Sequence, residues 1–279
     1  MKNALYILFL IFLTSACVGL DDEPAISAPP LVIEGWIEEG ESPIVIVTHA
    51  IDLTQPVDTF DNLVEKWGRV SVFDGDTRYV LTGRINKDYM PSFIFTSTRL
   101  KGKVGHTYRL LVETESDTVD AYATMLPKAN LLPLTIKKAE DRDSAYYVQA
   151  QIDNIDRNGY YKLFAKSEMT ESRYFGSFLG TFAGNEYDDK KGVSVLKGIH
   201  SGYSDREKDH YYSPGDRVTV KLCTLEPLIY DFWRTYDENV MLSENLFFTF
   251  DGNCRANING ALGYWAAYGM SIRTIRIPE

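Results

Sequence analysis

Short runs of β-branched and aromatic residues, separated by turn residues, constrain the fold of this chain more than any other feature. Between residues 31 and 126 there are seven such runs with no helical periodicity between them, and turns such as Asp74-Gly75-Asp76 lie between neighbouring runs. The runs cover residues 31–38, 43–49, 69–73, 78–82, 92–96, 106–113 and 118–124. This pattern predicts an N-terminal antiparallel β-sandwich, of the immunoglobulin or transthyretin kind, over residues 31–126.

The strand pattern resumes after a segment with two prolines, Pro127 and Pro133, where we place a domain boundary. Six more strand-like runs cover residues 134–139, 145–153, 160–168, 174–181, 216–224 and 263–277. We therefore expect a second β-rich domain over residues 127–279. The whole chain is predicted to be mostly β.

One amphipathic helix is predicted near residues 227–241 of the second domain. Its apolar side chains recur at helical spacing on one face, and Pro227 suits a first helical turn. These side chains are Ile229, Phe232, Trp233, Tyr236 and Val240. We expect this aromatic face to pack on the sheet, with a groove for a cofactor or a partner as the alternative.

The first sixteen residues have the order of a secretory signal peptide. Lys2 provides a cationic start, an apolar run covers residues 4–13, and small or polar residues precede Cys17. The apolar run is about half as long as the roughly twenty residues that a membrane-spanning helix needs. We therefore expect residues 1–16 to be removed rather than kept as a transmembrane anchor.

Cys17, directly after these small residues, resembles the lipidated cysteine of the bacterial lipobox, although Thr14 stands where that pattern prefers a large aliphatic residue. The resemblance implies a lipid anchor on Cys17 in the outer membrane, and an ordinary signal peptide with an incidental cysteine is the alternative. Residues 17–30 are polar, acidic and proline-containing, which predicts a flexible tether. The acids at 21–23 resemble a signal for export to the cell surface, or they are a plain solvated linker.

The net charge of −10 removes the electrostatic basis for binding nucleic acid, because that affinity depends largely on Lys and Arg neutralising phosphates. Two further cysteines, Cys223 and Cys254, remain in a chain expected to reach an oxidising compartment. We expect a disulfide between them. Two buried thiols are the alternative.

No catalytic signature is present. The four histidines are scattered, and no HExxH, GxSxG, phosphate-loop or dinucleotide motif occurs. We therefore expect no catalytic residue, metal or cofactor. The best candidate binding surface includes the aromatic residues of one long loop-like segment, because tyrosine-rich loops give contact area at low entropic cost, and two aromatic residues at the start of the strand-like run 263–277. These residues are Tyr203, Tyr211, Tyr212, Tyr264 and Trp265.

Several segments, taken in order, resemble the Bacteroidetes lipoprotein family known as domain of unknown function 4249. They are residues 31–37, 70–74, 105–110, 223–236 and 257–265. The resemblance implies an envelope lipoprotein with a β-sandwich first domain, typically encoded near TonB-dependent outer-membrane receptors. We therefore expect a binding or accessory component of such a transporter. A surface hydrolase acting on glycans or peptides and a structural or adhesion lipoprotein are the alternatives.

Overall fold

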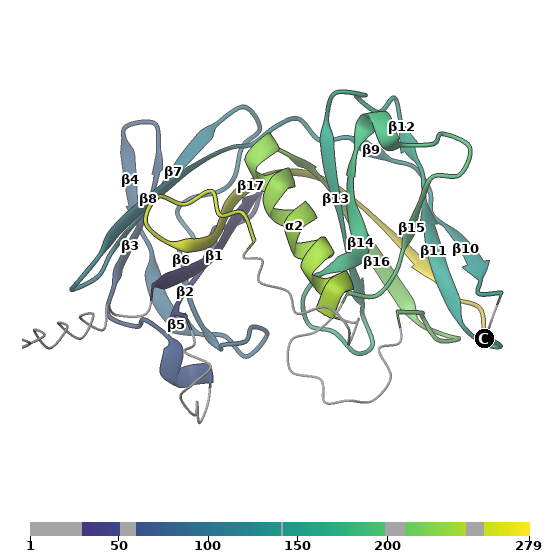
Figure 1. The fold of residues 1–279 in the computed structure, drawn as a ribbon, viewed down its shortest axis with the longest axis horizontal. Helices are drawn as coiled ribbons and strands as arrows, with labels where there is room; N and C mark the ends of the chain where they lie inside the picture. Colours follow the sequence, from purple (N-terminus) through teal and green to yellow (C-terminus); the bar gives the residue numbers. More distant parts are fainter. Residues whose placement is uncertain (1–29, 51–59, 141, 199–209, 244–253) are drawn as a thin grey trace, which may run out of the picture.

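The computed structural model describes residues 30–50, 60–140, 142–198, 210–243 and 254–279. Within these ranges the protein is mostly β, with one long helix, α2 (Pro227–Ser243), between two β-rich halves (Figure 1). The fold class predicted from the sequence is therefore confirmed. No helix in the described ranges is long and apolar enough to cross a membrane.

A single eight-stranded sheet runs through both halves of the molecule. Its strand order is β14-β13-β16-β17-β1-β2-β6-β5. In that order the strands are Phe175–Ala183, Tyr160–Ser167, Arg217–Leu225, Leu262–Arg276, Leu31–Glu38, Ile44–His49, Phe93–Thr96 and Thr82–Ile85.

Three smaller sheets complete the β-structure. The first has the order β4 (Thr77–Val80), β3 (Arg69–Asp74), β7 (Thr107–Glu113) and β8 (Thr118–Thr124). The second has the order β10 (Thr135–Lys138), β11 (Tyr146–Ala150) and β15 (Val193–Val195), and the third pairs β12 (Ile152–Asp153) with β9 (Asn130–Leu131). Two short 3-10 helices, η1 (Phe60–Leu63) and η2 (Gly184–Glu186), lie in connections.

The first core lies between the four-stranded sheet and the β17-β1-β2-β6-β5 part of the large sheet. Alternate residues of β1 point into it, so Ile33 and Ile37 are fully buried against Val72 and Leu110 of the opposite sheet. This arrangement is the sandwich that the seven N-terminal runs predict. It is completed by Trp265 from the far end of the chain, which is also fully buried in this core.

The second core lies on the same side of the large sheet, between its β13-β16-β17 part and the three-stranded sheet. Leu163 of β13 and Leu222 of β16 are fully buried in it, together with Val148 of β11. The two cores are therefore side by side under one sheet.

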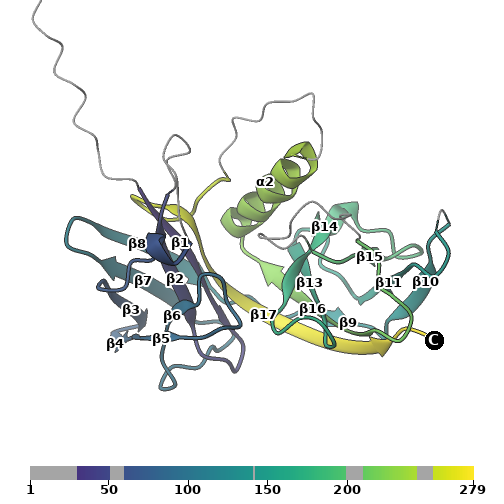
Figure 2. The same cartoon turned by 90° about the horizontal axis from the view of Figure 1, so that it is seen from below.

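Strand β17 belongs to both halves, and Figure 2 shows it running from one to the other. Its first part pairs with β1 in parallel, with Val32 opposite Leu262 and Glu38 opposite Tyr268. Its second part pairs antiparallel with β16. The parallel pair departs from the antiparallel sandwich predicted from the sequence, because period-two patterning does not identify a strand's partner. Residues 31–126 alone therefore do not make the first core.

The other face of the large sheet is covered by α2. Side chains of β17 alternate, so that Trp265 points into the first core while Tyr264 and Tyr268 pack with Phe232 and Trp233 of the helix. The aromatic face of α2 therefore packs on the sheet, as the helical spacing indicates.

A buried ion pair fixes α2 in place. The ammonium of Lys162, on β13, is fully buried and donates to both carboxylate oxygens of Asp237 at 2.9 and 3.0 Å. Asp237 also accepts from the backbone N–H of Thr181 at 3.2 Å. Burial lowers the pKa of Lys162, and the charge of Asp237 partly opposes that effect. Removal of one partner would leave an uncompensated charge under the helix.

The expected disulfide is absent, because Cys223 and Cys254 are both free thiols. Cys223 is buried on β16, which leads into the first turn of α2. Cys254 instead lies beside Asn239, whose amide donates to its sulfur at 3.5 Å. At a rise of 1.5 Å per residue, Asn239 lies about 18 Å along α2 from Pro227, so Cys254 packs beside the second half of the helix rather than its first turn. Burial raises the pKa of both thiols.

The close approach of β1 and β17 requires glycine at position 263. Gly263 has a φ of +94°, and a Cβ built there would lie 1.9 Å from the carbonyl oxygen of Ile33. We expect Gly263→Ala to lower the free energy of unfolding by about 3 kcal/mol, because backbone strain and steric overlap add. Urea denaturation of the purified protein measures the effect.

A matched control is Gly75→Ala in the β3-β4 turn. Gly75 also has a positive φ, +56°, but a Cβ added there would meet no atom within 4 Å. This substitution should cost only about 1 kcal/mol. Equal losses for the two variants would contradict a special role for the β1-β17 contact.

Candidate functional site

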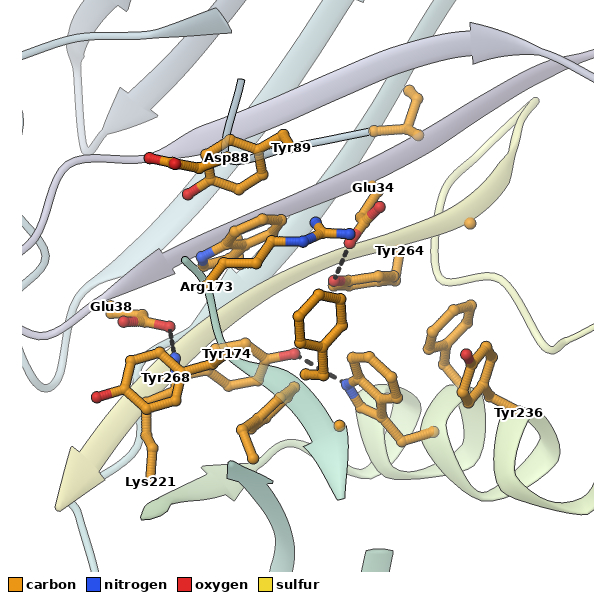
Figure 3. A pocket seen from close by; sticks show the side chains of 18 of the residues that line it. Glu34, Glu38, Asp88, Tyr89, Arg173, Tyr174, Lys221, Tyr236, Tyr264 and Tyr268 are labelled. Carbon is orange, nitrogen blue, oxygen red and sulfur yellow. Dashed lines mark hydrogen bonds and ion pairs between the residues drawn. The ribbon is translucent and has the colours of Figure 1, made fainter. Parts of the chain in front are cut away.

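A pocket of about 500 Å³ lies over the β1-β17 pair, on the face of the sheet that α2 partly covers (Figure 3). We call it the junction pocket, because its residues come from both halves of the molecule. Ten of its lining residues are aromatic: Trp36, Tyr89, Phe164, Tyr174, Phe175, Phe232, Trp233, Tyr236, Tyr264 and Tyr268. Five carry charge: Glu34, Glu38, Asp88, Arg173 and Lys221. Its volume is within the range of small-molecule sites.

The floor of the pocket follows from the alternation of two strands. Glu34, Trp36 and Glu38 occupy the even positions of β1, so they point away from the first core and are half-buried. The parallel register then places Glu34 opposite Tyr264 and Glu38 opposite Tyr268. The chain thus builds the floor from two strands that are more than two hundred residues apart in the sequence.

One end of the pocket holds a closed ion pair. Lys221, from β16, donates to the carboxylate of Glu38, and its ammonium lies 4.3 Å from the centre of the Tyr174 ring. Burial, the largest single effect, would lower the pKa of Lys221, but the charge and hydrogen bond of Glu38 together with Cys223 and Tyr174 outweigh it, and the pKa is raised. Both charges are therefore satisfied within the protein.

The middle of the pocket holds a carboxyl group with a raised pKa. Tyr264 donates its hydroxyl hydrogen to Glu34 at 3.4 Å. Burial raises the pKa of Glu34, although the positive charge of Arg173 and the hydrogen bond from Tyr264 both favour the carboxylate. Burial and the charge of Glu34 in turn raise the pKa of Tyr264 well above its ordinary value.

Arg173 faces this carboxyl group from the segment that precedes β14 (Figure 3). Its guanidinium carbon lies 4.8 Å from the ring centre of Phe175 and 5.4 Å from that of Tyr89. Among the described residues, no carboxylate lies within ion-pair distance of Arg173. The rings of Phe175 and Tyr89 therefore hold the guanidinium of Arg173 beside Glu34, and Arg173 forms no ion pair with Glu34.

The helix supplies the remaining wall. The indole N–H of Trp233 donates to the hydroxyl of Tyr268 at 2.9 Å, which fixes both rings. Tyr236, one turn further along α2, is half-buried and lies close enough to Glu34 for that charge to raise its pKa, after the larger effect of burial. The pocket is thus largely formed by rigid elements.

The chemistry of the pocket favours binding over hydrolysis. A glycosidase needs two carboxyl groups flanking the scissile bond, but Glu38 is engaged by Lys221 and Glu34 faces an arginine. The third carboxyl group of the lining, Asp88, is exposed. No group of three or more His, Cys, Asp or Glu side chains that could hold a metal occurs in the described part of the chain. The pocket instead offers aromatic faces with donors and acceptors between them.

Only one of the predicted surface residues lies in this pocket. Tyr264 lines it, whereas Trp265 and Tyr212 are buried in the first and second cores, so their assignment to a surface was wrong. Tyr211 is half-buried, with the guanidinium of Arg142 5.8 Å from its ring centre. Tyr203 and the predicted lipidation site Cys17 lie outside the described residues.

Sequence reasoning missed the charged residues that define the site. Glu34 and Glu38 interrupt an otherwise apolar strand, and Lys221 sits within a strand that is buried over eight of its nine residues. A charge in such a strand is costly unless it is paired, so it is a usable signal for a site. Arg173 has no comparable signal, because its neighbours in the sequence read as a turn.

Comparison with known protein families gives a match over most of the chain. The model of a family described as "Domain of unknown function (DUF4249)" matches residues 19–273. No curated protein matches the chain.

The electrostatic link between Arg173 and Glu34 is open to a direct test. In Arg173→Gln the pKa of Glu34 should rise further, because the cation that favours the carboxylate is lost. Infrared difference spectra recorded across a pH titration measure the carboxyl band, and Glu34→Gln identifies it. The control, Arg78→Gln, removes a guanidinium that bonds Glu113 on the first sandwich, and should leave the titration unchanged. An unaltered titration in Arg173→Gln would refute the link.

Proposed function

This chain belongs to the DUF4249 family, and from that premise and the junction pocket we propose that it is a lipid-anchored envelope protein that binds a small ligand beside a TonB-dependent outer-membrane transporter. In this role it captures the ligand and acts as an accessory component of the transporter. The observation that carries the binding role is the pocket itself.

Three properties of the pocket support binding. Much of its wall belongs to β1, β17 and α2, which are packed on the cores, so these parts need little ordering when a ligand enters. Tyr89 and Arg173 come from connections between strands. Its aromatic lining provides a large area of contact. Its buried charges, such as Lys221 and Glu38, are paired with each other and therefore do not need a substrate to satisfy them.

The proposed localisation in the cell envelope rests on the sequence of the first 23 residues, which lie outside the described ranges. The order of a cationic start, a short apolar run and small residues before Cys17 supports lipidation and anchoring in the outer membrane. A position beside a transporter is supported by the family resemblance, because members of this lipoprotein family are typically encoded near TonB-dependent outer-membrane receptors.

The lipid anchor can be tested at its single attachment site. Cys17→Ser should move the protein from the membrane fraction to the soluble fraction, because a serine cannot carry the thioether lipid. Fractionation with immunoblotting measures the shift, and metabolic labelling with a fatty acid should lose its signal in the same variant. Cys254→Ser serves as the control, since Cys254 is half-buried in the folded protein. A Cys17→Ser protein that remains in the membrane fraction would disprove lipidation.

The transporter role predicts a stable partner. Affinity purification of the tagged protein from membranes solubilised in a mild detergent should recover a large β-barrel receptor as the main co-purifying protein. Mass spectrometry identifies it, and a tagged, unrelated outer-membrane lipoprotein is the control. Recovery of the tagged protein alone would count against the transporter role and favour a structural or adhesion function.

A further inference from the structure

The junction pocket combines aromatic faces with hydrogen-bonding groups of both kinds. Trp36 and Tyr89 are half-buried, with ring centres 6.0 Å apart and planes tilted by 43°. The face of an aromatic ring is electronegative, so it attracts C–H bonds that carry a partial positive charge. The C–H bonds of a sugar ring have this character because each carbon bears an oxygen.

Glu34 and Arg173 present an acceptor and a donor to the same space. They face one another, and the described residues include no hydrogen bond or ion pair between them. The cation of Arg173 is held instead over Tyr89 and Phe175. A ligand group that both donates and accepts could bridge the two, and a hydroxyl is the simplest such group.

The charge balance excludes two other ligand classes. Glu38 and Lys221 neutralise each other, and Glu34 is opposed by Arg173, so these four groups offer no excess charge to a strongly ionic ligand. Asp88, the fifth charged residue of the lining, is exposed to solvent. A purely apolar ligand would exclude water from Glu34 and Arg173 without replacing their hydrogen bonds, which is costly. An uncharged ligand rich in hydroxyl groups avoids both penalties.

We infer that the junction pocket binds a short, uncharged saccharide, with a sugar ring against Trp36 and Tyr89 and its hydroxyl groups between Glu34 and Arg173. This inference rests on the proposed binding function and specifies its ligand class. The volume of about 500 Å³ suits a ligand of a few rings at most.

The test is isothermal titration calorimetry of the purified protein with a panel of probes. The panel contains neutral mono- to tetrasaccharides of hexoses, pentoses and N-acetylhexosamines. It also contains glucuronate as a charged counterpart and cyclohexanol as an apolar one. We expect saturable binding of at least one neutral saccharide, with glucuronate and cyclohexanol binding at least tenfold more weakly.

Variants locate the binding site. Glu34→Gln keeps the shape of the side chain but removes the carboxylate, and should weaken saccharide binding about tenfold or more, the usual effect of a lost hydrogen bond to a charged group. Trp36→Ala should weaken binding similarly through lost ring contact. Trp67→Ala is the matched control, because Trp67 is 94% exposed and is not among the residues that line the pocket. It should bind as the wild type does.

Each contrary outcome overturns the inference. Preferred binding of glucuronate that is lost in Arg173→Gln would make the pocket an anion site, and preferred binding of cyclohexanol would make it an apolar site. Absence of binding across the saccharide panel would refute the proposal outright. Recovery of a barrel partner without saccharide binding would refute this inference alone, and saccharide binding without a barrel partner would refute the transporter role alone.

Discussion

Hydrogen bonding of β17 to two strands at once determines how the rest of this structure is arranged. Its first part pairs with β1 and its second part with β16, so the two halves share one continuous sheet. The same face of β17 contributes Trp265 to the first core and, through the residue that follows the strand, Ile277 to the second. Neither core is complete without the C-terminal strand. We therefore regard the two sandwiches as one cooperative unit.

The same shared strand explains why the pocket lies where it does. The two sandwiches lie side by side under one sheet, and among the described residues α2 covers only part of the other face of that sheet. Residues at the even positions of β1 and β17 face that side, including Glu34 and Tyr264. The buried ion pair between Lys162 and Asp237 fixes the helix that forms one wall. Tyr89 and Arg173, which lie in connections between strands, complete the lining.

The sequence was sufficient for most of the local structure. The predicted run at 31–38 matches β1, and the apolar spacing after Pro227 matches α2, because these patterns depend on burial of neighbouring residues. The parallel pairing of β1 with β17 was not predictable, since alternation specifies a buried face but not a partner. The site depends on that pairing, so Tyr264 is the one predicted surface residue that lines the pocket. Phe232, Trp233 and Tyr236 also line it, but they were predicted as the packing face of the helix, with a groove as the alternative. Trp265, the neighbour of Tyr264, was misplaced because one step along a strand reverses the face.

The long sequence separation between β1 and its partner β17 has a consequence for how the protein folds. During synthesis β1 leaves the ribosome long before β17. Until β17 follows, β1 lacks this partner strand and the first core lacks Trp265. Contacts between such distant segments form slowly, because a long loop has to close first. Because β1 and β17 are far apart in the sequence, the first core is completed late in folding. Under the proposed envelope location the chain is exported before it folds, and pairing between such distant segments delays formation of the first core.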